Sequence, residues 1–119
     1  MSNDIRGEVE VALGGRTWTM RPTFQAICEI QGRTGKDILT VAGECWAGRF
    51  SAVTVAAVLW AAIRAAHDDA PDFEAVGAMI VEEGITTFFE PVLALLANAL
   101  AGLGAGEDAG EGEGEAKNA

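Results

Sequence analysis

Basic residues are scarce in this chain. Its 119 residues include 8 Lys or Arg against 18 Asp or Glu, which gives a net charge of −10 at pH 7. No segment concentrates the basic side chains, so attraction to a phosphate backbone is disfavoured. We therefore expect no nucleic acid among the partners.

Long hydrophobic runs and a secretory signal are also lacking. The longest strongly apolar run, residues 52–63, is broken by Arg64 and is well short of the roughly 20 residues that a membrane-spanning helix needs. The first six residues have neither the basic start nor the apolar stretch of a signal peptide. These absences predict a cytoplasmic protein with no membrane partner.

Cysteine and histidine are rare, and neither has a neighbour that suggests chemistry. Cys28 and Cys45 form no CxxC pair, so we expect them to be reduced thiols that fill core space. His67 is the single histidine, and we expect it at the end of a helix, where an imidazolium would interact favourably with the helix dipole. No serine or cysteine lies in a recognisable nucleophile setting. The sequence thus predicts no enzymatic activity.

Two further segments resemble ligand sites only superficially. Asp68, Asp69 and Asp72 lack the twelve-residue ligand pattern of a calcium loop, and a solvated turn with a helix cap explains them more simply. The glycine-rich run 102–106 follows a helix, lacks a lysine and precedes five carboxylates, so a linker is favoured over a phosphate-binding loop. We expect no metal and no cofactor.

The first regular pattern is a β-hairpin. Residues 8–13 and 16–20 alternate between polar and apolar, and Gly14-Gly15 between them tolerates the positive φ angles of a tight turn. One face would carry Val9, Val11, Leu13, Trp18 and Met20. Because an isolated hairpin is only marginally stable, helices must cover this face.

Helical spacing dominates the rest of the chain. The expected helices span 24–33, 37–47, 51–67, 72–84 and about 86–102, with Thr23, Ser51 and Asp72 as N-caps and Pro91 in the first turn of the last helix. This predicts an α+β fold, mostly α, in which the hairpin packs on a bundle of about five helices within a domain 1–102. The acidic Gly/Glu-rich tail 103–119 is expected to be disordered.

Aromatic residues are expected to anchor the core. Trp18, Trp46 and Trp60 have no flanking basic residues of the kind that accompany nucleic-acid stacking, so burial is favoured. We expect Trp18 and Phe24 to be buried together where the hairpin meets the first helix.

The last helix carries more apolar residues than one core-facing stripe requires. The candidate partner-binding residues on it are Phe88, Phe89, Val92, Leu93, Leu96 and Leu100. Either this helix is central and the others surround it, or part of its surface, with Trp46 or Trp60, binds another apolar helix or a second copy of the chain.

Several short motifs, in order and spacing, are similar to those of a known family. They are Arg6-Gly7-Glu8-Val9, Gly14-Gly15-Arg16, the run from Arg21 to Ile30, Gly48-Arg49-Phe50-Ser51 and the run from Ile63 to His67. On these residues the chain resembles the tail assembly chaperone family of siphophages and gene transfer agents, whose members are also labelled phage tail tube proteins. The resemblance covers most of residues 5–101.

The resemblance implies a non-enzymatic role in virion assembly in the cytoplasm of a bacterial host. A chaperone of this type would bind the long, helical tape-measure protein and keep it soluble until tail tube subunits polymerise around it. The implied partners are the tape-measure protein and the tail tube subunit, with self-association possible. The alternative is a structural tail tube component, although tube subunits consist mainly of β-sheet and this sequence predicts two strands.

Overall fold

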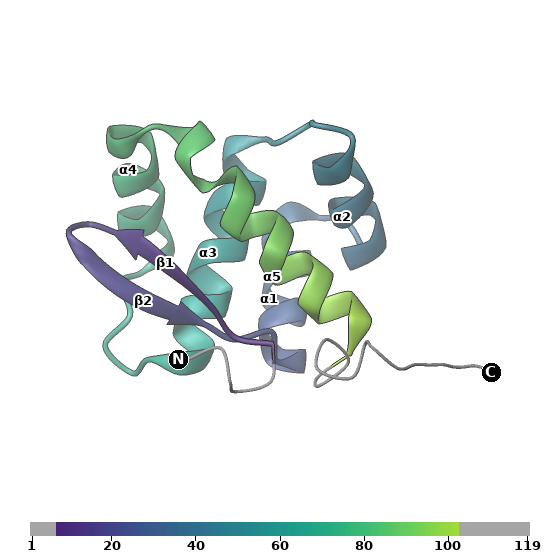
Figure 1. The fold of residues 1–119 in the computed structure, drawn as a ribbon, viewed down its shortest axis with the longest axis horizontal. Coiled ribbons are helices and arrows are strands. Elements are labelled where there is room, and N and C mark those ends of the chain that lie inside the picture. The colour runs from purple at the N-terminus through teal and green to yellow at the C-terminus, as the bar shows by residue number, and fades with distance from the viewer. Residues whose placement is uncertain (1–6, 103–119) are drawn as a thin grey trace.

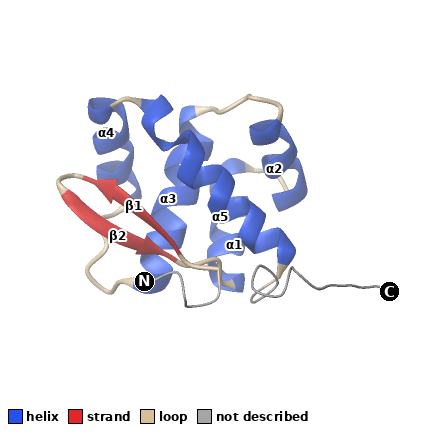
Figure 2. Cartoon of the chain, viewed as in Figure 1, coloured by secondary structure: helices blue, strands red, loops and turns tan. Residues whose placement is uncertain are grey.

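The computed structural model describes residues 7–102, in which a hairpin is followed by a set of packed helices (Figure 1). The elements are β1 (Val9–Leu13), β2 (Arg16–Met20), α1 (Phe24–Thr34), α2 (Ile38–Trp46), α3 (Ala52–Ala66), α4 (Phe73–Glu83), the 3-10 turn η2 (Ile85–Phe88) and α5 (Phe89–Ala101). The expected α+β architecture with five α-helices is confirmed (Figure 2). The tail predicted at 103–119 lies outside the described residues.

The hairpin has the turn that the two glycines predict. Strands β1 and β2 pair antiparallel with Val11 opposite Trp18, and Gly14 and Gly15 have φ angles of 64° and 79°. Positive φ at both central residues matches the twist of the flanking strands. One face of the hairpin is buried, through Val11, Leu13, Trp18 and Met20.

The helices start where polar caps stand in the sequence. The side chains of Thr23, Asp37, Ser51 and Asp72 each accept a hydrogen bond from a backbone N–H in the first turn of α1, α2, α3 and α4. Such a bond satisfies a donor that the helix cannot satisfy internally. The expected start of the last helix shifts, because the 3-10 turn η2 precedes it and α5 begins at Phe89.

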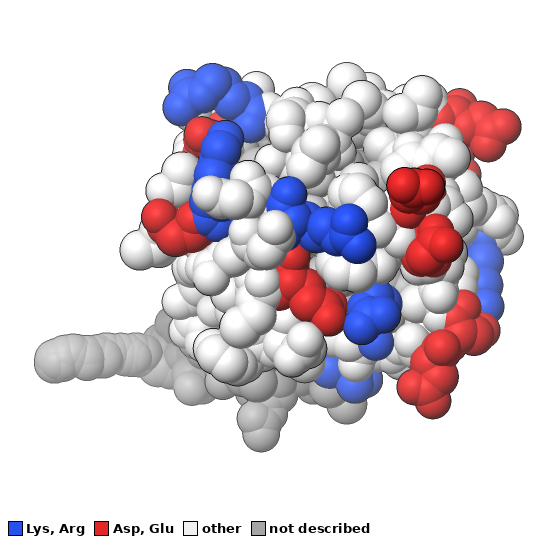
Figure 3. Space-filling model, turned by 180° about the vertical axis from the view of Figure 1, so that it is seen from behind, with Lys and Arg blue, Asp and Glu red and all other residues white. Residues whose placement is uncertain are grey.

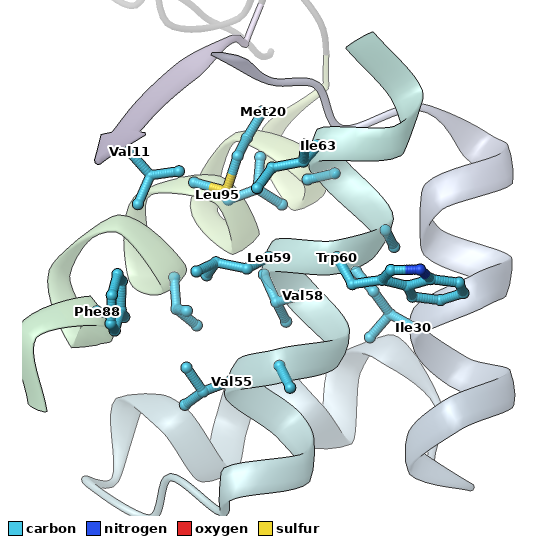
Figure 4. Close-up of a cluster of buried hydrophobic side chains, with 14 of the residues drawn as sticks. Val11, Met20, Ile30, Val55, Val58, Leu59, Trp60, Ile63, Phe88 and Leu95 are labelled. Carbon is cyan, nitrogen blue, oxygen red and sulfur yellow. The ribbon is translucent and has the colours of Figure 1, made fainter. Parts of the chain in front are cut away.

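Helix α3 forms the centre of the core. Its residues 54–63 are all buried, and α1, α4, α5 and β2 pack against it. Figure 4 shows Val55, Val58 and Leu59 of α3 among side chains from the hairpin and from the C-terminal helices. The continuous burial explains the absence of a polar stripe along α3.

His67 fastens the hairpin to the end of α3. Its Nε2 accepts a hydrogen bond from the backbone N–H of Thr19 at 3.0 Å, and its ring meets that of Trp18 edge to face at 5.0 Å. The expected place of His67 at the C-terminal end of a helix is confirmed, and its side chain connects this end of α3 to β2.

A second attachment uses an ion pair between the exposed Arg21 side chain and the buried Glu8 side chain. The carboxylate of Glu8, 4% exposed, is 2.6 Å from a guanidinium nitrogen of Arg21, and the Arg21 backbone N–H donates to the carbonyl of Ala62 at 3.0 Å. The segment between β2 and α1 is thereby tied to α3 and to the start of β1.

Three expectations about burial are wrong. Phe24 is 81% exposed and does not join Trp18 in the core, Trp46 is 53% exposed, and Cys28 is on the surface. In α1 the reason is the choice of face, because Ala26 and Ile30 are the buried residues of this helix. Phe24 and Cys28, one turn apart, share another side of it.

Candidate partner-binding surface

Helix α5 does not offer the surface that its composition suggested. Phe88, Val92 and Leu96 are fully buried, Phe89 and Leu93 are half-buried, and Leu100 is 43% exposed. Contacts with α2, α3 and β1 cover much of the helix. The surplus of apolar residues on α5 therefore serves the core, and three of the six candidate residues have no surface to offer a partner.

Exposed apolar area lies instead on α2. Leu39 is 68% exposed and Trp46 is 53% exposed, and Gly43 lies between them. These residues have the i, i+4, i+7 spacing of one helix face. We call Leu39, Gly43 and Trp46 the α2 stripe.

The α2 stripe is exposed because the opposite side of the helix is anchored. Val41, Ala42 and Cys45 are buried, and burial raises the pKa of the Cys45 thiol. Because α2 is apolar on both sides, sequence periodicity could not distinguish the anchored side from the exposed one. For this reason the predicted burial of Trp46 is wrong, and its exposure fits the alternative in which Trp46 contacts a partner.

The N-terminal end of α2 is held firmly in place. Asp37 caps the helix by accepting from the N–H of Thr40 at 2.8 Å, and this bond holds the pKa of Asp37 below its usual value. Lys36 pairs with Glu44 at 2.9 Å, and the Gln31 side chain accepts from the N–H that starts the helix. The stripe is thus presented by a fixed element and not by a loop.

Gly43 has no side chain, so the helix backbone is accessible in the middle of the α2 stripe. A Cβ placed at Gly43 would meet no atom within 4 Å, so nothing in the described part of the protein requires a glycine there. A glycine between two large apolar residues lets another backbone approach the helix closely. The sequence analysis did not predict this exposed face, although the i, i+4, i+7 spacing of Leu39, Gly43 and Trp46 could have indicated it.

An aromatic stack adjoins α2. The rings of Phe50, in the loop after α2, and Phe89, at the start of α5, are parallel within 9° and 3.8 Å apart. Both side chains are half-buried, and α2 and α5 contact each other. The stack thus connects the loop after α2 to the start of α5.

Charge is distributed unevenly along the chain. Residues 67–102 contain no Lys or Arg, whereas residues 7–66 contain six. The carboxylates of the later segment are Asp68, Asp69, Asp72, Glu74, Glu82, Glu83 and Glu90. On the face in Figure 3, red groups gather on the side of α4, whereas both signs lie next to each other in the middle.

The aspartates that were weighed as a cation site have structural roles. Asp69 pairs with Arg16 at 2.9 Å, a hydrogen bond that lowers the pKa of Asp69, and Asp72 caps α4. Within residues 7–102 no three His, Cys, Asp or Glu side chains form a group that could hold a metal ion.

No single helix among the described residues is long and apolar enough to cross a membrane. Helix α4 and the segment 85–101 together have the length and composition of a membrane span, but the chain bends by 112° between them.

Comparison with known protein families gives a match over almost all of the described residues. The family model described as "Phage tail tube protein, GTA-gp10" matches residues 6–102, which include every element of the fold. No curated protein and no solved structure matches the chain.

Proposed function

Since the chain belongs to the family described as phage tail tube protein, GTA-gp10, we propose that it works in tail assembly as a non-enzymatic chaperone in the cytoplasm of the bacterial host. In this role it binds apolar stretches of the helical tape-measure protein until tail tube subunits enclose them. The observation that carries the proposal is the α2 stripe, an exposed apolar helix face on a rigid element.

The stripe suits a helical partner. Leu39 and Trp46 stand two turns apart, and a partner helix can approach the backbone between them at Gly43. A helix that lies in an apolar groove contributes side chains at this same spacing.

The fold supports a chaperone better than a wall subunit of the tube. The described residues contain one sheet of two strands, and helices make up most of the remainder. A ring closed by β-sheet needs strands with free edges that pair from subunit to subunit. A small helical protein instead offers apolar helix faces.

A structural tail tube component is the second candidate. The description of the matching family, which names a phage tail tube protein, favours it. The two roles differ in the finished particle, because a tube subunit dominates purified tails whereas an assembly chaperone is absent from them. Quantitative mass spectrometry of purified particles distinguishes the two.

The binding test is co-expression with the tape-measure protein of the same gene cluster. We expect the wild-type chain to keep that protein soluble and to co-purify with it. Leu39→Asp and Trp46→Asp should each lower the recovered tape measure at least about tenfold, because a carboxylate would be desolvated in the contact.

Val81→Asp is the matched control. Val81 is 66% exposed, close to the 68% of Leu39, and it lies on α4 among carboxylates. This variant should recover the tape measure as the wild type does. Equal loss with all three variants, or no loss with either α2 variant, would refute binding through the stripe.

A further inference from the structure

Two guanidinium groups lie around the ring of one tryptophan. The central carbon of the Arg33 guanidinium is 4.8 Å from the Trp60 ring centroid, and that of Arg64 is 5.2 Å from it. The Arg33 guanidinium is also 4.3 Å from the centroid of Phe73, whose ring meets that of Trp60 edge to face. We call Arg33, Trp60, Arg64 and Phe73 the arginine patch. These four residues come from α1, α3 and α4.

The two rings hold Arg33 in a defined position. Trp60 is buried on α3, and in Figure 4 its ring points toward α1, the helix that carries Arg33. A guanidinium that stacks on a ring keeps its N–H groups free at the edges of its own plane. Because Arg33 is exposed, these donors are accessible from the surface.

Arg33 differs from Arg64 in its ion pairs. Arg64 pairs with Glu29 at 3.1 Å, whereas no carboxylate among residues 7–102 forms an ion pair with Arg33. Glu29 thus balances one of the two guanidinium groups, and the positive charge of Arg33 remains. A planar guanidinium of fixed orientation can bind a carboxylate through two parallel N–H bonds. The arginine patch therefore has the charge and the geometry to receive a carboxylate.

The acidic segment 103–119 supplies carboxylates on the same chain. It contains five acidic side chains and one lysine. The acidic residues are Glu107, Asp108, Glu111, Glu113 and Glu115. Seventeen residues span up to about 60 Å when fully extended, and the protein measures 45 Å along its longest axis. The segment is therefore long enough to reach the patch.

A short series of contacts connects the end of α5 to the arginine patch. Asn98 of α5 donates to the carbonyl of Gly7 at 3.0 Å, and the next residue, Glu8, pairs with Arg21. The Arg21 guanidinium donates to the carbonyl of Ala65 at 3.4 Å, and Ala65 directly follows the arginine that α3 contributes to the patch. The segment 103–119 thus begins on the side of the protein where α3 ends.

We propose that the acidic segment 103–119 binds the arginine patch of its own chain, with a carboxylate in the plane of the Arg33 guanidinium. A single exposed ion pair is weak. Because the segment is attached to the fold, however, its effective concentration at the patch is in the millimolar range. Five carboxylates can also occupy the site in turn, which raises its occupancy.

Paramagnetic relaxation enhancement tests where the segment lies. A nitroxide is attached to Ala109→Cys in a full-length chain whose exposed Cys28 is replaced by serine, and the sample with reduced nitroxide is the reference. We expect broadened amide signals at the end of α1 and the start of α4, around Arg33 and Phe73. At about 1 M salt, where charges are screened beyond about 3 Å, this broadening should disappear.

Arg33→Gln and Arg49→Gln form a matched pair. Arg49 is also exposed and has no ion pair among residues 7–102, but it belongs to the loop after α2 and not to the arginine patch. Each variant removes one positive charge. Arg33→Gln should reduce the broadening at least about threefold, whereas Arg49→Gln should leave it as in the wild type. Arg33→Lys keeps the charge without the planar donors and should give an intermediate value.

A second variant leaves the patch intact and changes the segment. All five acidic residues of 103–119 are replaced by the corresponding amides, so the chain keeps its length and the described fold keeps its sequence. The NMR signals of the Arg33 Nε–H and the Trp60 Nε1–H should shift relative to the wild type. In about 1 M salt the two chains should give the same signals at these groups.

Three outcomes would overturn the proposal. The first is equal loss of broadening with Arg33→Gln and Arg49→Gln, which would indicate diffuse attraction. The second is unchanged Arg33 and Trp60 signals in the variant without the five carboxylates. The third is equally strong broadening when a nitroxide-labelled chain is mixed with a separate ¹⁵N-labelled one, which would indicate contact between copies. The tape measure takes no part, and the patch lies outside the α2 stripe, so this failure is distinguishable from failure of the chaperone role.

Discussion

Trp18 offers the sharpest test of how the hairpin is held on the helices. Its side chain is 6% exposed, its Nε1–H donates to the carbonyl of Leu13 at 3.1 Å, and its ring meets His67 edge to face. The Arg16 guanidinium lies 3.7 Å from the ring centroid. Trp18→Ala removes all of these contacts at once.

The expected loss of unfolding free energy for Trp18→Ala is about 4 kcal/mol. Truncation of a buried aromatic residue costs about 3 to 5 kcal/mol, and the lost hydrogen bond is included in that range. Trp18→Phe keeps most of the ring packing but leaves the Leu13 carbonyl without its donor, which costs about 1 to 2 kcal/mol. The order of stability should therefore be wild type, Trp18→Phe, Trp18→Ala.

Urea unfolding followed by circular dichroism measures the difference. A loss of about 4 kcal/mol should lower the midpoint by roughly 2 to 3 M if the slope is unchanged. Phe24→Ala is the matched control, and it should change stability by less than about 0.5 kcal/mol. A loss below about 1 kcal/mol for Trp18→Ala would refute the proposed attachment.

Three further variants test other parts of the fold. Gly14→Ala should lower the unfolding free energy by about 1 to 2 kcal/mol in urea, because φ is 64° and the new Cβ would collide with the Met79 sulfur; an unchanged midpoint would contradict this geometry. Arg21→Met should cost about 2 kcal/mol, since Glu8 stays buried without its partner, and changing both residues to Met should recover part of the loss; additive losses would exclude the coupling. Asp37→Asn should flatten the acid limb of the stability profile. The lowered folded pKa of Asp37 means that its contribution is present above the unfolded pKa and is lost as pH falls through the folded one, so an unchanged limb would count against the cap.

Much of the fold could be predicted because local chemistry determines it. The glycine pair requires a tight turn, and Thr23, Ser51 and Asp72 each offer an oxygen to the first turn of a helix. These effects involve atoms within a few residues of one another, so they can be recognised without knowledge of the tertiary packing.

The candidate site could not be predicted in the same way. Helical spacing shows that α2 and α5 have apolar residues on more than one side, but which side is covered depends on neighbours distant in sequence. Leu96 is buried because α5 packs against α2, α3 and β1, whereas Trp46 stays exposed at the edge of that packing. Phe24 is exposed for the same reason, because α1 presents Ala26 to the core.

The start and the end of the described chain are joined side by side. The Asn98 side chain donates to the carbonyl of Gly7 at 3.0 Å, a contact across 91 positions, and α5 packs against β1. Tags or fused domains attached at residue 7 and at the end of α5 would therefore lie in one region of the surface. Two large ones attached at the same time would clash. The same closeness makes the fold suitable for circular permutation, with a short peptide between the old ends and new ends opened at the Gly14-Gly15 turn.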